Sequence, residues 1–273
     1  MTGPVAQIVS LTVYSNAYLS GKEPFSFNLS NSTAQFCEKI RFVDWVKKLF
    51  KNGEKIIAEN PDEWVKLLKN SGIKSLWLHY VPSQNADLKD RYSAGFVGGG
   101  GRWLIEAGYE NNSDYWEARW EVGNKDAQNK RIWIVTYGRI SRNDIKRQFK
   151  PDSLVTVSQR LEQNLKEIKG FAERHDLKHF GECFEKGLKC LNSPNPLDFV
   201  YHKDLLPSSS QSMESLQILC SCQAAWVFGG MGSWNDMCFD GDEQEVYKRV
   251  SDALYKTICE AIPAAVNSII MKS

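Results

Sequence analysis

The segment from Gly229 to Met237 holds the densest group of residues that could bind a small polar ligand. Its glycines would let backbone N–H groups approach a ligand, and Ser233, Asn235 and Asp236 add polar side chains. Trp234 could stack on the bound molecule. The favoured alternative is a tight turn between helices in which Trp234 fills the core. Ser233 is not expected to act as a nucleophile, because no histidine is near it in the sequence and no Gly-x-Ser-x-Gly pattern is formed.

A second group of ionisable residues follows the clearest alternating pattern in the chain. Glu117, Arg119 and Glu121 alternate with apolar residues and would project from one face of a strand. Arg102 and His79 occur in neighbouring predicted strands. Carboxylates on adjacent strands could act as general acid and base. Cross-strand ion pairs on a solvated face explain the same pattern and are the favoured interpretation.

Four consecutive glycines, Gly98–Gly101, raise the question of a phosphate site. Glycine loops hold phosphates when they lead into the N-terminus of a helix. Here the next residues, beginning with Arg102, have the composition of a strand, and the lysine and hydroxyl of a P-loop are absent. The run therefore predicts a flexible hairpin tip, which could cover a ligand beside Arg102.

His175, His179 and Cys183 have the spacing of zinc ligands on one continuous helix. The apolar stripe changes sides near His175, which predicts a break at that point. We therefore expect packing roles for these residues, and predict neither a metal nor a cofactor.

Composition limits the classes of partner. Lys and Arg total 34 against 33 Asp and Glu, and the basic surplus typical of a nucleic-acid-binding protein is missing. No apolar run reaches the length of a membrane span. The first residues lack the pattern of a signal peptide, so the seven cysteines are expected to be free thiols in a cytoplasmic protein.

The first half of the chain reads mainly as strands that follow one another with short loops, which predicts an antiparallel meander. Apolar residues spaced by three and four predict one helix over Thr33–Phe50. Asn60 and Pro61 have the residue types that begin a second helix. The predicted strands cover Val5–Tyr14, Pro24–Leu29, Ile73–Val81, Tyr92–Val97, Arg102–Tyr109, Tyr115–Val122 and Arg131–Ile140.

The second half has helical periodicity throughout. Asp176 is predicted to cap a new helix after the break at His175. Pro263 is predicted to start a short last helix. The predicted helices before it cover Leu154–Ala172, Leu177–Leu191, Met213–Phe228 and Glu243–Ile262.

The sequence thus predicts an α+β fold in one domain, with a β-rich part over residues 1–150 and a helical part over residues 151–273. The leading functional hypothesis is a non-enzymatic binding or interaction module for a protein or a polar small molecule. A second hypothesis is a hydrolase or transferase that uses Glu117, Asp236 and His79. A third is a small-molecule sensor in which the glycine run closes over the ligand.

Overall fold

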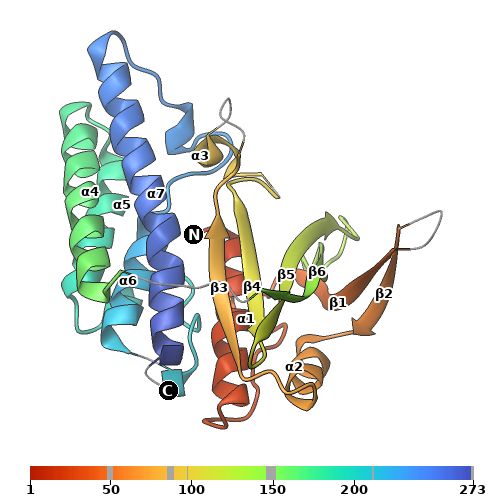
Figure 1. Ribbon diagram of the computed structural model, residues 1–273. Helices are drawn as coiled ribbons and strands as arrows, with labels where there is room; N and C mark the ends of the chain where they lie inside the picture. The colour runs from red at the N-terminus through yellow and green to blue at the C-terminus, as the bar shows by residue number, and fades with distance from the viewer. Residues whose placement is uncertain (48–51, 85–88, 97, 146–151, 211, 272–273) are drawn as a thin grey trace.

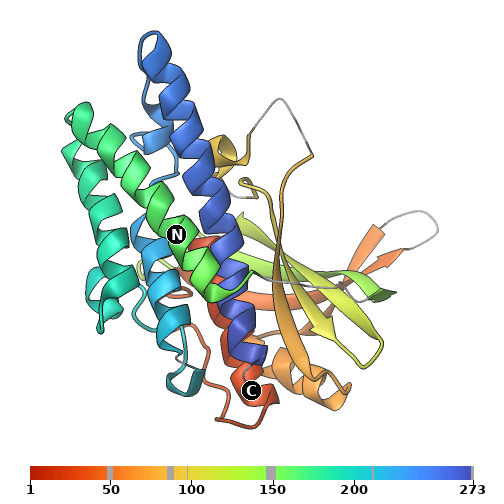
Figure 2. The same ribbon diagram turned by 60° about the vertical axis from the view of Figure 1, so that its left-hand side comes forward.

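The computed structural model describes residues 1–47, 52–84, 89–96, 98–145, 152–210 and 212–271. Within them the chain has the predicted α+β composition, with a six-stranded sheet in the first half and helices in the second. Figure 1 shows these helices on one side of the sheet, and Figure 2 shows α7 nearest to it. No helix of the described residues is both long and apolar enough to cross a membrane. The second-half helices are α4 (Leu154–Arg174), α5 (Lys178–Asn192), α6 (Met213–Ala224) and α7 (Asp242–Met271).

The sheet is mixed, so the prediction of a purely antiparallel meander is wrong. Its strand order is β2-β1-β6-β5-β4-β3, and β1 runs parallel to β6 while every other pair is antiparallel. The alternation within a strand shows which face is buried but does not show which strand lies beside it. The strands are β1 (Cys37–Lys47), β2 (Asn52–Ala58), β3 (Ser75–Val81), β4 (Arg102–Gly108), β5 (Asn112–Val122) and β6 (Trp133–Ile145).

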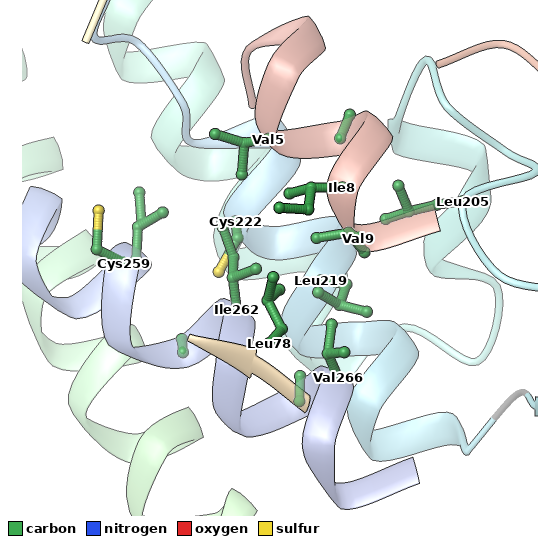
Figure 3. Close-up of a cluster of buried hydrophobic side chains, with 14 of the residues drawn as sticks. Val5, Ile8, Val9, Leu78, Leu205, Leu219, Cys222, Cys259, Ile262 and Val266 are labelled. Carbon is green, nitrogen blue, oxygen red and sulfur yellow. The ribbon is translucent and has the colours of Figure 1, made fainter. Parts of the chain in front are cut away.

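The predicted first strand, Val5–Tyr14, is instead part of helix α1 (Gly3–Leu19). Every residue from Val5 to Val13 is buried, so the helix has no polar face and shows no helical period. Without a helical period, the β-branched residues of this short apolar run favour the prediction of a strand. Figure 3 shows the reason for the burial, since Val5, Ile8 and Val9 of α1 point toward α6, α7 and β3.

The predicted helix over Thr33–Phe50 is wrong, because β1 occupies Cys37–Lys47; residues 48–50 lie outside the described part. Phe42 and Val43 are both buried although they are neighbours, and the register of β1 with β2 shifts between them. This bulge interrupts the alternation that marks a strand. Phe42 stacks on Trp64 at 4.4 Å and on Tyr137 at 5.3 Å between ring centroids.

Two further predicted strands are absent from the described residues. Pro24–Leu29 has no regular structure over its first four residues and ends in a bend and a turn. Tyr92–Val97 gives way to a short helix, α3 (Asp90–Ser93), and a turn; Val97 itself is outside the described residues. Asp90 accepts a hydrogen bond from the Tyr80 hydroxyl at 2.6 Å, so a tertiary contact holds this segment. Helix α2 (Pro61–Asn70) begins as predicted, and the Asn60 side chain accepts a bond from the N–H of Glu63.

The helical half follows the prediction with three corrections. The break after α4 is present, but Asp176 does not cap α5, whose first flanking residue is Leu177. Asp176 has a left-handed backbone conformation, with φ +53°, and the N–H of Leu177 donates to the carbonyl of Ala172. This arrangement is a common C-terminal cap, and it ends α4. Helix α6 ends at Ala224 rather than Phe228. Helix α7 continues through Pro263, because burial on all sides there outweighs the lost hydrogen bond.

One continuous cluster of buried side chains includes residues of the sheet, of α1 and of the C-terminal helices. Leu78 of β3 lies among Val9, Ile262 and Val266 in this cluster (Figure 3). Polar contacts reinforce the junction, because the Asn267 side chain bonds both the N–H and the carbonyl of Leu78 at 2.8 Å. Whether the whole chain is one domain stays a prediction.

Candidate functional site

A cavity of about 520 Å³ lies between the start of α1 and the sheet. Residues of β4, β5 and β6 line one side of it, and the turn after α3 lines another. Two loops complete it, one around Ser32 and one around His202. Its volume falls in the range of pockets that hold small molecules.

Aromatic rings line this cavity from the sheet and from two loops. Trp103, Trp120 and Trp133 line it from the sheet, and the rings of Trp120 and Trp133 meet edge to face at 6.0 Å. Phe36 and Phe96 also line it and are 48% and 68% exposed, which places them at its margin. A flat apolar molecule entering the cavity would be covered by these rings.

Arg102 and Glu117 are the charged pair of the cavity lining. The guanidinium donates two parallel bonds to the carboxylate, Nε to Oε1 at 2.8 Å and Nη2 to Oε2 at 2.7 Å. Hydrogen bonding to Glu117 raises the pKa of Arg102. The side chains are 53% and 26% exposed, so the pair lies at the margin of the cavity. No other Lys, Arg, Asp or Glu of the described chain lines it, and its ionic charges therefore cancel.

A hydroxyl and an imidazole of the cavity lining, from Ser32 and His202, meet the carboxylate of Asp204. Ser32 Oγ lies 2.8 Å from Nδ1 of His202 and also bonds the Asp204 carboxylate. The Ser32 N–H donates to the same carboxylate at 2.8 Å. Burial lowers the pKa of His202 to about 4, so its ring is neutral at pH 7. The sequence does not predict this group, because Ser32 and His202 are 170 positions apart.

Comparison with protein-family models, with curated proteins and with solved structures finds no match to this chain.

None of the four residues of the predicted ligand loop, Ser233–Asp236, lines the cavity. Trp234 is fully buried, and its Nε1 donates to the Ser251 hydroxyl at 2.7 Å. The Asn235 amide donates to the carbonyl of Arg91 at 2.6 Å and accepts a bond from its guanidinium at 3.1 Å. Trp234 and Asn235 thus have partners within the protein.

Ser233 and Asp236 cap a short 3₁₀ turn (Trp234–Asp236). The Ser233 hydroxyl accepts a bond from the N–H of Asn235 at 3.2 Å. The Asp236 carboxylate accepts a bond from the N–H of Ser233 at 3.2 Å and another from the N–H of Gly232. This reciprocal capping holds the loop in one shape.

The glycine run leads into β4, as its sequence indicates, but it is a packed turn. A Cβ on Gly99 would lie 2.0 Å from the carbonyl oxygen of Ser93, and one on Gly95, just before the run, would lie 2.2 Å from the carbonyl carbon of Gly229. Gly100 accepts a bond from the Tyr255 hydroxyl at 2.7 Å. These contacts connect the wall of the cavity to the Ser233–Asp236 loop and to α7.

The other predicted site residues lie elsewhere on the sheet. His79 is buried, and its Nε2 is 2.7 Å from Oε2 of Glu106. Arg119 pairs with Glu54 of β2 at 2.6 Å. Of the predicted residues, the cavity therefore brings together only Arg102 and Glu117.

The histidines of α4 and α5 do not share a partner. His175 Nε2 lies 2.8 Å from Glu243 at the start of α7, whereas the His179 ring lies against Phe180. Among the described residues, no three His, Cys, Asp or Glu side chains are grouped closely enough to hold a metal ion.

Proposed function

We propose that this protein is a non-enzymatic binding module that holds a small, uncharged, largely apolar molecule in the cavity beside α1. The observation that carries the proposal is the aromatic lining of a cavity whose only described charges form the Arg102–Glu117 pair. Apolar rings favour an apolar ligand, and a neutralised ion pair gives little attraction to a charged one. Gly98, Gly99 and Gly101, the run that the sensor hypothesis uses as a flap, also line the cavity, but the packing of this turn gives no support to a closing movement.

The geometry of the Ser32 group favours binding over hydrolysis. In a catalytic triad the imidazole stands between hydroxyl and carboxylate and takes the hydroxyl proton. Here the Ser32 hydroxyl stands between His202 and Asp204, so its proton is directed to the carboxylate. Glu117, Asp236 and His79, the residues of the hydrolase or transferase hypothesis, lie in three separate environments. The cytoplasmic location stays a prediction.

Filling the cavity tests the proposal. Ala118 lines the cavity on β5, and Ala118→Trp would occupy the space that a ligand needs. A thermal-shift screen of neutral aromatic fragments should give compounds that raise the melting temperature of the wild type. Those compounds should have no effect on Ala118→Trp.

Val122→Trp is the matched control, because Val122 is on the same strand, is 45% exposed and does not line the cavity. It should respond to the compounds as the wild type does. The proposal is overturned if no neutral aromatic compound stabilises the wild type, or if Ala118→Trp responds as strongly as the control.

A further inference from the structure

The position of one proton follows from the contacts of Ser32. Its hydroxyl oxygen bonds both Nδ1 of His202, at 2.8 Å, and the Asp204 carboxylate. A hydroxyl has one proton to donate and a carboxylate can only accept. The hydroxyl therefore donates to Asp204 and accepts a bond from His202, which places a proton on Nδ1.

This arrangement leaves Nε2 of His202 as an acceptor. A neutral imidazole with its proton on Nδ1 has a lone pair on Nε2. Burial lowers the pKa of the ring to about 4, which keeps it neutral. His202 lines the cavity, and Nε2 has no hydrogen-bond partner among the described residues. His202 is half-buried rather than fully enclosed, so part of its side chain is open to the cavity.

We infer that His202 Nε2 is the hydrogen-bond acceptor of this cavity, and that its ligand is a neutral aromatic compound carrying an O–H or N–H donor. The inference rests on the proposed function and adds the chemistry of the ligand. The donor would meet the imidazole at one margin of the cavity. The apolar body would lie against Trp103, Trp120 and Trp133.

Three probes of similar shape separate the hydrogen bond from apolar burial. 2-Naphthol has an O–H donor, 2-methoxynaphthalene has an ether in its place, and naphthalene has neither. Titration calorimetry on the wild type should show 2-naphthol binding about 3- to 10-fold more tightly than 2-methoxynaphthalene, the range expected for one hydrogen bond.

Two variants test the residue. His202→Leu removes the acceptor and should abolish the preference for 2-naphthol. His202→Gln can place an amide oxygen near the position of Nε2 and should keep part of it. If His202→Leu does not fold, a long-range ¹H–¹⁵N NMR spectrum of the wild type provides the test. It should show the His202 proton on Nδ1 and a shift of the Nε2 signal when 2-naphthol is added.

The possible failures are distinct. Equal binding of all three probes to the wild type, or a proton found on Nε2, overturns the role of His202 and leaves the proposed function standing. An unchanged preference in His202→Leu does the same. If no probe binds and Ala118→Trp behaves as the wild type in the fragment screen, the proposed function is lost as well.

Discussion

Each of the four histidines has a different neighbour, and the neighbour decides what the ring can do. His79 is buried against Glu106, and His175 joins the end of α4 to Glu243. The His179 ring contacts Phe180. Only His202 lines the cavity, and a neutral hydroxyl engages its Nδ1. A histidine therefore packs against an aromatic ring at position 179 and offers a hydrogen-bond acceptor to the cavity at position 202.

The lowered pKa of His202 predicts how stability depends on pH. Burial lowers this pKa to about 4, the nearby Met1 amino group acts in the same direction, and Asp204 acts in the opposite one. The unfolded ring has an ordinary pKa near 6.5. Between these values the unfolded chain binds more protons, so the free energy of unfolding should fall as pH falls from about 6.5 to about 4.

Urea unfolding at several pH values across this window provides the measurement. Carboxylates also titrate near its acidic end, so the readout is the difference between the wild type and His202→Gln. As the pH falls, the wild type should lose more stability than His202→Gln. A difference that is constant with pH would contradict the prediction.

At this scale the sequence predicts only part of the candidate site. The sequence places Glu117 on one face of its strand and offers Arg102 or Trp103 from the neighbouring strand, and the structure pairs Glu117 with Arg102. Ser32 and His202 belong to loops, whose side chains follow no period. Their contact depends on how two distant loops meet, and neither loop carries that information locally.

Among the elements, β3 is one of the two edge strands of the sheet, and two asparagines cover its open side. Asn16 of α1 bonds the N–H and the carbonyl of Leu76, and Asn267 of α7 does the same at Leu78, all at 2.8 Å. Each amide satisfies the backbone groups that a further strand would have paired. The two helices therefore end the sheet at this edge.

Asn267→Leu should destabilise the protein by about 2–4 kcal/mol, because it leaves a buried N–H and a buried carbonyl of Leu78 unpaired. Chemical denaturation measures the loss. Asn192→Leu is the matched control, since Asn192 is exposed at the end of α5 and bonds only its own helix at 3.5 Å. A loss in Asn267→Leu no larger than in the control would show that the asparagine does not protect the edge.

Local sequence patterns predict β5 and α4 correctly and mislead at α1 and β1. β5 has a clear alternation and α4 has a clear stripe, and both occur where expected. Helix α1 is enclosed on all sides, so nothing in its sequence marks a face. In β1 a bulge places two buried residues side by side. In both cases the surroundings decide the structure more than the local pattern does.

Across the whole molecule, the contacts between the two halves predict a single unfolding transition. Arg91 is buried and its guanidinium bonds Asp252 of α7 at 2.7 Å, and Asn267 of the same helix bonds β3. The buried cluster is continuous from the sheet to the helices. Opening either half alone would expose this junction, which disfavours a partly unfolded state. Far-ultraviolet circular dichroism reports mainly on the helices, whereas most tryptophans belong to the first half.

Urea unfolding followed by both signals should therefore give coincident curves with one midpoint. Asp252→Ala, which leaves the buried Arg91 without its ionic partner, should lower that midpoint for both signals together. Asp152→Ala is the control, since Asp152 is 52% exposed and pairs with Arg160, which is itself 38% exposed. Two separate midpoints in the wild type, or a shift of only one signal in Asp252→Ala, would mean that the halves unfold independently and that the chain has two domains.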